Sequence, residues 1–153
     1  MGMKPRFTKA DVRRTMRNKR SQLADAIISR LELIGFEFVK MARSKNASTG
    51  GFNDVTGNLR SSIGFAVLRN GETVNENFEQ SNSGTDKATG VQAAKSFIDE
   101  LKGKFPRGYA LIVVAGMSYA AAVESRGKDV ITGSGLVAEV MLKQAMQRLK
   151  DRF

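Results

Sequence analysis

The chain of 153 residues contains neither cysteine nor histidine. The missing cysteines exclude disulfide bonds and thiolate metal sites, and they are compatible with a reducing compartment. The missing histidines remove the commonest general base and the commonest metal ligand. Ser–His–Asp and Cys–His arrangements therefore cannot be built here, and an enzyme would depend on Asp, Glu, Lys, Ser or Tyr alone.

Long apolar runs are also lacking. The longest lie near residues 110–115 and 119–123, well short of the ~20 residues that a membrane-spanning helix needs. Residues 1–7 have no apolar segment of the kind found in signal peptides. Residues 48–51 lack the Gly-Lys-Ser/Thr ending of a phosphate-binding loop. We therefore expect a soluble cytoplasmic protein without catalytic activity, cofactor, bound metal or membrane partner.

Positive charge is abundant and lies mainly in the N-terminal segment. Of a net charge of +10, residues 1–45 contribute 12 Lys or Arg against 4 Asp or Glu, and the rest of the chain contributes 13 against 11. Steps of four, four and three place half of the eight basic residues in 4–20 on one helix face, with another basic residue beside it. These residues are Lys9, Arg13, Arg17 and Arg20, with Arg14 as the neighbour. Such a stripe could bind DNA phosphates, dock on an acidic protein partner, or simply be solvated.

The apolar pattern predicts a long N-terminal helix over residues 8–45. Its apolar residues recur three, four or seven apart: Val12, Met16, Leu23, Ile27, Leu31, Ile34, Phe38 and Met41. A continuous helix would be ~57 Å long, whereas a globule of this size measures ~38 Å across. The helix must therefore protrude, or break near Ser21, which could cap a second helix. A protruding apolar stripe would need a partner.

The remaining patterns predict a small antiparallel sheet and two further helices. Alternating apolar residues indicate a strand at 63–68, and Asn70-Gly71 favours a tight hairpin turn to a return strand at 73–78. Residues 109–115 are nearly all apolar, which favours a central strand. Residues 119–124 could be a helical turn or an extended piece.

Helical spacing predicts one inserted helix at 86–102 and, after a loop at 127–135, a C-terminal helix at 136–152. The expected apolar face of that last helix is Leu136, Val140, Leu142, Ala145, Met146 and Leu149. The fold class is therefore α+β: a long N-terminal helix, a small antiparallel sheet with a hairpin, one inserted helix and a C-terminal helix. The length suits a single domain, residues 1–153, with a basic arm at 1–20 and an α+β body at 21–153.

Two segments carry the most distinctive patterns. The first is Thr56, Gly57, Asn58, Leu59, Arg60 and Ser61, and the second contains Tyr119, Ala120, Val123, Glu124 and Gly127. In the first, Thr56 could cap a short helix, Gly57 would relax the turn and Leu59 would anchor it in the core. In the second, small residues would allow close packing, while Tyr119 and Glu124 could each reach a polar partner. Without other evidence, both are ordinary turns.

Together, in this order, the two segments resemble a known family. The run from Phe52 to Ile63 is similar to the signature of the tail-completion, or head–tail joining, proteins of long-tailed double-stranded-DNA bacteriophages. In that family a hairpin and a strand follow, then a Tyr-Ala-x-x-Val-Glu-x-x-Gly segment and a C-terminal helix. The resemblance covers nearly the whole chain, although the inserted helix at 86–102 departs from the usual pattern.

The resemblance implies a virion structural protein that forms a homo-oligomeric ring, usually a hexamer, at the phage neck. The ring would join the DNA-filled head to the tail, contact head-closure or connector proteins and tail-tube or tail-terminator proteins, and pass DNA through its lumen. Localisation would be the virion, and the host cytoplasm during assembly. The motif residues would serve the subunit interface, so that Arg60 is expected to matter for assembly rather than for monomer stability. The alternatives are a tail-terminator ring subunit and a nucleic-acid-binding protein that uses the basic first helix.

Overall fold

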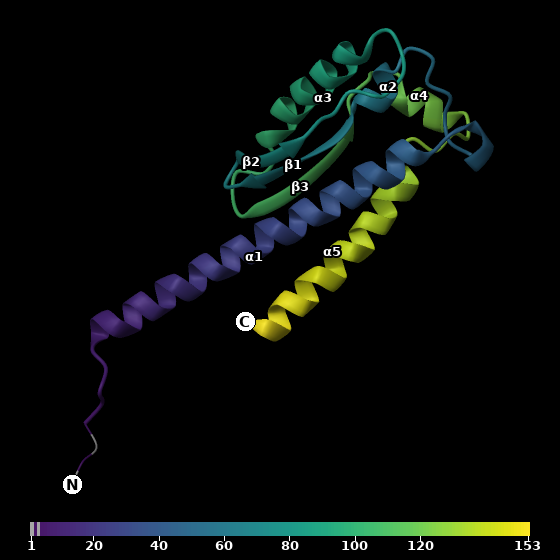
Figure 1. Ribbon diagram of the computed structural model, residues 1–153. Coiled ribbons are helices and arrows are strands. Elements are labelled where there is room, and N and C mark those ends of the chain that lie inside the picture. Colours follow the sequence, from purple (N-terminus) through teal and green to yellow (C-terminus); the bar gives the residue numbers. More distant parts are fainter. Residues whose placement is uncertain (1, 3) are drawn as a thin grey trace.

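The computed structural model describes residue 2 and residues 4–153, so the sequence predictions for residues 1 and 3 lie outside the described part. The elements follow one another along the chain as α1 (Lys9–Ser44), η1 (Ala47–Thr49), α2 (Asn58–Ser61), β1 (Ile63–Arg69), β2 (Glu72–Asn77), α3 (Lys87–Lys102), β3 (Tyr109–Ala115), α4 (Ala120–Ser125) and α5 (Thr132–Arg152) (Figure 1). This arrangement confirms the predicted α+β class, including the inserted helix.

Helix α1 is continuous over 36 residues, and the alternative of a break near Ser21 is wrong. It begins with a capping box: the Asp11 N–H donates to the Thr8 hydroxyl at 3.2 Å, and the Thr8 N–H donates to the Asp11 carboxylate at 2.8 Å. At ~1.5 Å per residue the helix is ~54 Å long. Its first buried residue is Ala24, and the preceding part projects beyond the body (Figure 1). We call residues 4–20 the arm, which is the main part of the basic arm predicted at residues 1–20.

The sheet has the strand order β2-β1-β3, with both pairs antiparallel. The prediction that 109–115 forms the central strand is wrong, because β3 lies at an edge and β1 is central. Six of the seven β1 residues are buried. The apolar character of β3 has another cause: helices cover both faces of the sheet, so an edge strand can also have apolar side chains on both sides.

The molecule has three layers, with helices on either side of the sheet (Figure 1). Between the sheet and α1 with α5 lies the larger apolar cluster, which includes Leu31, Ile34, Phe38, Phe52, Leu59, Ile63, Phe65 and Val130. Between the sheet and α3 lies the smaller one: Ala66, Leu68, Ala94, Ile98, Ile112 and Val114. Helix α1 packs closely on β1 at Gly35. A Cβ on this residue would lie only 2.5 Å from the Phe65 ring, so glycine permits the close approach.

The β1–β2 hairpin is confirmed. Asn70 and Gly71 have φ values of 53° and 83°, as a type I′ turn requires. A bulge interrupts the pairing between Val67 and Leu68. None of the helices in the described part of the chain is long and apolar enough to cross a membrane.

Helix α5 differs from its prediction in two ways. It begins at Thr132, so residues 133–135 are helical rather than part of a loop. Its predicted apolar face is confirmed at Leu142, Ala145 and Leu149, which pack inward, but Leu136 and Val140 are 61% and 54% exposed and Ala138 is buried instead. The reason is that α5 packs lengthwise against α1, so the position of α1 decides which side chains of α5 are covered (Figure 1).

Candidate functional site: the two motif segments

The turn of the first motif is built around a carboxylate, Asp54. Its Oδ1 accepts a hydrogen bond from the Gly57 N–H at 3.0 Å and its Oδ2 accepts one from the Arg60 N–H at 2.7 Å. The prediction that Thr56 caps the helix is wrong. Gly57 occupies the cap position with a φ of 77°, and the Asn58 N–H lies 3.5 Å from the Thr56 hydroxyl. Asp54 therefore satisfies N–H groups that a short helix leaves free.

Gly57 is required at this turn for two reasons. Its positive φ is unfavourable for residues with a side chain. A Cβ here would also lie 2.2 Å from the Ser83 carbonyl oxygen, in the segment that leads to α3. The motif glycine thus allows the turn and the following loop to approach each other.

Arg60 binds the end of α1. Its guanidinium donates to the carbonyl oxygen of Lys45 at 3.0 Å and also to that of Arg43. It lies 5.1 Å from the centroid of the Phe52 ring. Carbonyl groups at a helix C-terminus have no partner within the helix, so a cationic donor stabilises them. Arg60 is therefore engaged within the monomer, which argues against the expectation that it matters little for monomer stability; its role in assembly stays a prediction.

The middle of the first motif is buried. Leu59 is 3% exposed and belongs to the larger apolar cluster, in agreement with its predicted role as an anchor. The fully buried Ser61 hydroxyl donates to the Gly57 carbonyl oxygen at 2.5 Å and accepts from the Ser81 N–H at 2.8 Å. These residues hold the turn together and have little surface for a partner subunit.

The second motif forms a helical turn, which decides between the two alternatives for residues 119–124. Ala120 is 8% exposed and packs in the larger cluster, while Ala121 and Ala122 are exposed. The Tyr119 hydroxyl donates to the Asn58 side-chain oxygen, so the two motif segments touch although 61 residues separate them. Burial, followed by the nearby Asp54 carboxylate, raises the pKa of Tyr119 above its ordinary value.

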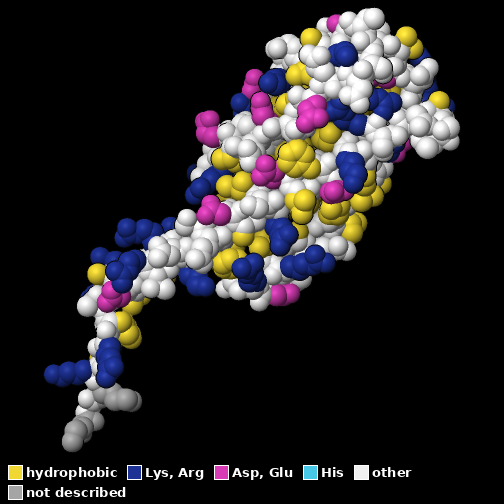
Figure 2. All heavy atoms as spheres, in the orientation of Figure 1, with side chains coloured by type: hydrophobic (Ala, Val, Ile, Leu, Met, Phe, Trp, Pro, Cys, Tyr) yellow, Lys and Arg dark blue, Asp and Glu magenta, His cyan; other side chains and the backbone are white. Residues whose placement is uncertain are grey.

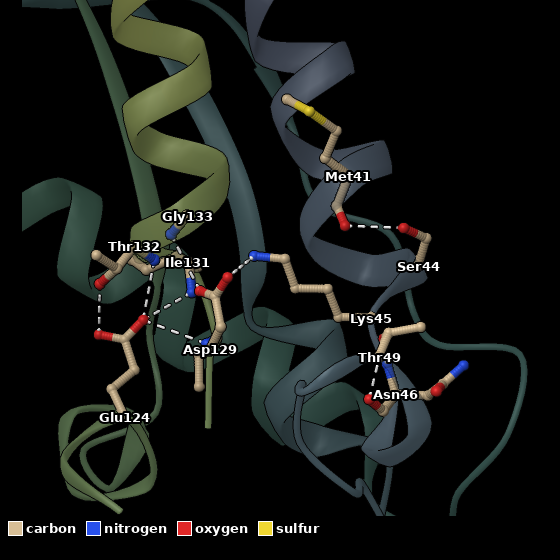
Figure 3. Close-up of polar contacts among 11 residues, drawn as sticks. Met41, Ser44, Lys45, Asn46, Thr49, Glu124, Asp129, Ile131, Thr132 and Gly133 are labelled. Atoms are coloured by element: carbon tan, nitrogen blue, oxygen red, sulfur yellow. Dashed lines mark hydrogen bonds and ion pairs between the residues drawn. The ribbon is translucent and has the colours of Figure 1, made fainter. Parts of the chain in front are cut away.

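Glu124 caps the start of α5 (Figure 3). Its Oε1 accepts from the N–H groups of Val130, Ile131 and Thr132 at 3.2, 2.8 and 2.9 Å, and its Oε2 accepts from the Thr132 hydroxyl at 2.9 Å. Partial burial opposes ionisation, but these bonds outweigh it and lower the pKa of Glu124. The capping explains why α5 begins before its predicted start. Gly127, with a φ of 78°, follows α4 and turns the chain toward this cap.

A second carboxylate, Asp129, joins the end of α1 to the start of α5. Lys45 Nζ lies 2.5 Å from Asp129 Oδ2, and the Gly133 N–H donates to Oδ1 at 3.1 Å (Figure 3). Burial opposes the ionised form, yet the Lys45 hydrogen bond and the Gly133 N–H lower the pKa of Asp129. The apolar spacing of the sequence does not predict this pair. An acid shortly before the 133–135 segment could have indicated a helix start there.

The basic stripe lies elsewhere, on the arm. Lys9, Arg13, Arg17 and Arg20 are all exposed, and Arg14 pairs with Asp11 at 2.9 Å. Lys and Arg side chains gather along the arm in Figure 2. The two motif segments lie at the opposite end of the body, near α2 and α4 (Figure 1). The structure therefore brings the motif residues together with one another but not with the stripe.

The acidic residues in and beside the two motifs accept hydrogen bonds from the backbone. Asp54, Glu124 and Asp129 all accept bonds from main-chain N–H groups. Within residues 2 and 4–153, no group of three or more acidic side chains is placed to hold a metal ion. The arrangement is suited to holding chain segments in fixed positions.

Comparison with known proteins gives no match: no family model, no curated protein and no solved structure is similar to this chain.

Proposed function

We propose that this chain is a structural subunit of a homo-oligomeric ring at the neck of a long-tailed phage. The ring completes the tail and joins it to the DNA-filled head, and DNA passes through its lumen. The observation that carries this proposal is the contact between the two motif segments, made by the Tyr119 hydroxyl and the Asn58 side chain. A non-catalytic role is part of the proposal.

The contact matters because it turns two weak sequence patterns into one structural unit. Gly57 permits the turn, Arg60 holds the end of α1, and Glu124 caps α5. These three motif residues thus have physical tasks at the corner where α1, α2, α4 and α5 meet (Figure 1). Two motifs that build one corner together support a fold like that of the family they resemble better than two unrelated turns would.

A second line of support comes from uncovered apolar side chains. On the arm, Phe7 and Met16 are 64% and 67% exposed, and on α5 Leu136 is 61% exposed. A closed ring needs two different patches on each subunit, so that one copy meets the next head to tail. The distant positions of these side chains suit such heterologous contacts.

A conditional mutant of the encoding phage tests the proposal. Without this protein, DNA-filled heads and tails of normal length should accumulate separately, and adding purified protein should join them. Quantitative mass spectrometry of purified wild-type virions should find the chain at about six copies per particle, the usual number for the family it resembles. Tails of irregular length would favour the tail-terminator alternative instead. Absence of the chain from virions, with its presence only in infected-cell extracts, would contradict the proposal.

A further inference from the structure

The positive charge of the arm is almost uncompensated. Residues 4–20 contain eight Lys or Arg against one Asp. That carboxylate, Asp11, already binds Thr8 and Arg14. Within the described part of the chain, four exposed basic side chains of the arm have no ion-pair partner: Lys9, Arg13, Arg17 and Arg20. The arm therefore carries a strong positive charge into the solvent (Figure 2).

The three arginines of this group surround one shallow hollow on the arm. Arg13, Arg17 and Arg20 border it together with Met16, and its volume is about 320 Å³. Side chains three and four residues apart on a helix are neighbours, so the guanidinium groups repel one another here. An anion between them would be stabilised by all three. Arginine is also the residue whose planar fork fits the oxygens of a phosphate group.

These arginines lie on the side of α1 that faces inward in the body. Arg13 and Arg20 precede Ile27 and Ile34 by steps of seven residues, which are close to two helical turns. Ile34 is 2% exposed in the larger apolar cluster, and Ile27 packs against that cluster. Where α1 leaves the body, its inward side thus changes from apolar to basic. A helix that continued to pack on an apolar layer would keep apolar residues there.

A second copy of this chain does not supply the missing negative charge. Residues 21–153 contain 17 Lys or Arg against 14 Asp or Glu, so the body is itself slightly basic. Some of its exposed carboxylates are also paired already, as Asp99 is with Lys102 and Glu139 is with Lys143. An anion that balances the arm therefore belongs to another kind of molecule.

We propose that the arm binds the phosphate backbone of double-stranded DNA, with the guanidinium groups of Arg13, Arg17 and Arg20 on the phosphates. The three residues are spread over ~10 Å of the helix axis, at ~1.5 Å per residue. Duplex DNA carries one negative charge per ~1.7 Å of its own axis, so several phosphates are within this length. The inference rests on the proposed neck function for its setting, because DNA passes through the lumen of such a ring.

Other polyanions fit the arm less well. A helix that lies in a membrane interface has a broad apolar face beside its basic one. In residues 9–20 the apolar side chains larger than alanine are Val12 and Met16 alone. This helical part of the arm also has no aromatic ring on which the bases of single-stranded DNA would stack. Duplex DNA, whose phosphates lie on its outside, needs neither feature.

Fluorescence anisotropy with the full-length protein and a labelled duplex of about 30 base pairs tests the contact. We expect binding at about 50 mM salt that weakens steeply toward about 200 mM, because phosphate contacts release counterions. With three arginines in contact, the slope of log K against log salt should be about −3 or steeper. A second duplex of unrelated sequence should bind equally, since phosphate contacts do not read the bases.

The decisive variant combines Arg13→Gln, Arg17→Gln and Arg20→Gln. It should bind the duplex at least about tenfold more weakly at low salt, with a shallower salt slope, because the phosphate contacts are lost. The matched control removes the same charge from exposed positions on the body: Lys104→Gln, Arg107→Gln and Arg126→Gln. This control should keep most of the affinity of the natural chain. Circular dichroism verifies that both variants keep their helices.

Three outcomes would overturn the proposal. In the first, the arm variant and the body variant bind the duplex equally, so that net charge alone matters. In the second, the natural chain does not bind the duplex even at low salt. In the third, vesicles that contain phosphatidylserine, or polyglutamate, bind the natural chain more tightly than the duplex does, which identifies a membrane or an acidic protein as the partner.

The two proposals can fail separately. A chain that is found in the virion neck, but whose arm variant binds DNA as well as the natural chain does, would remove the DNA contact and leave the neck function intact. Duplex binding through the arm of a chain that is absent from virions would do the reverse.

Discussion

Charged side chains in the two motifs act mainly on the polypeptide backbone. Asp54 binds the N–H groups that start α2, Arg60 binds the carbonyl groups that end α1, and Glu124 binds the N–H groups that start α5. A helix end leaves such groups without partners, and leaving them buried and unpaired is costly. At the residue scale, the motif pattern is thus explained by the joining of helix ends.

Arg60→Ala should destabilise the folded monomer by about 1–3 kcal/mol, because charged hydrogen bonds to two carbonyl oxygens and the stacking on Phe52 are lost together. Urea denaturation monitored by circular dichroism measures the change. Arg126→Ala, at an exposed position after α4, is the control and should change the free energy of unfolding little. An Arg60→Ala chain as stable as the natural one would mean that these bonds contribute nothing and that the residue acts in assembly alone.

Glu124→Gln should remove a pH-dependent part of the stability. The pKa of Glu124 is lowered in the folded protein from its ordinary value of 4.5, so its contribution is present above that pH and is lost as the pH falls through the folded pKa. The difference in unfolding free energy between the natural chain and Glu124→Gln should therefore be widest near neutral pH and should narrow in acid.

Glu139→Gln is the control for the pH dependence expected of Glu124→Gln. Glu139 also has a lowered pKa, owing to Lys143, but it is exposed on α5 and caps nothing. Solvent screens such a pair, so little change is expected. Equal effects of the two substitutions at all pH values would argue against the capping role of Glu124.

Helix α1 is unusual among the elements because its C-terminal half packs against the rest of the protein while its N-terminal half is exposed. Its inner half packs on the sheet and α5, and its first buried residue is Ala24. Helical stability in proteins comes largely from such packing. The arm instead relies on the capping box at Thr8 and on continuity with the packed half.

Deletion of residues 1–20 should leave the body folded, with a free energy of unfolding within about 1 kcal/mol of the natural chain, because the removed segment buries little. The helical circular dichroism signal should fall in proportion to the lost helical residues. Leu31→Ala, at a position that is 4% exposed in the packed half of α1, should cost about 2–5 kcal/mol in the same assay. Unfolding of the body on deletion of the arm would show that the arm has contacts within its own chain.

Elements with local signals could be predicted from the sequence. The 3–4 spacing of apolar residues located α1 and α3, and Asn70-Gly71 located the hairpin. Signals that depend on tertiary contacts could not. The early start of α5 did have a local signal, the acids Glu124 and Asp129 that accept its first N–H groups, but the spacing of apolar residues alone does not show it. Its inner face depends on the position of α1, and the edge position of β3 depends on strand pairing rather than on composition.

The residues of the candidate site also divide into those whose role follows from residue type and those whose role depends on tertiary contacts. Leu59 as an anchor and Tyr119 with one polar partner were predictable, because burial and hydroxyl chemistry follow from residue type. The role of Arg60 was not, because its partners are carbonyl groups of residues 43 and 45, which the fold alone brings near. That Asn58 would be the partner of Tyr119 also depends on the meeting of distant segments.

In the whole molecule, the positive charge and the projecting part of the fold lie at the same end. The arm is strongly basic and projects from one end, while the two motif segments build the corner at the other end (Figure 1, Figure 2). A monomer gains nothing evident from a rigid exposed arm with apolar side chains. A subunit whose neighbour covers the apolar side chains of the arm, while the basic ones face DNA, explains both features, and repetition of the subunit contact by rotation would close a ring.

Cryo-electron microscopy of intact virions from the encoding phage is the most direct test of the neck function. We expect a symmetric ring between head and tail into which this chain can be traced, with the long α1 of each copy reaching its neighbour and the lumen open for DNA. Virions with a resolved neck in which no density fits this chain would contradict it, and would favour a nucleic-acid-binding role for the basic helix outside the particle.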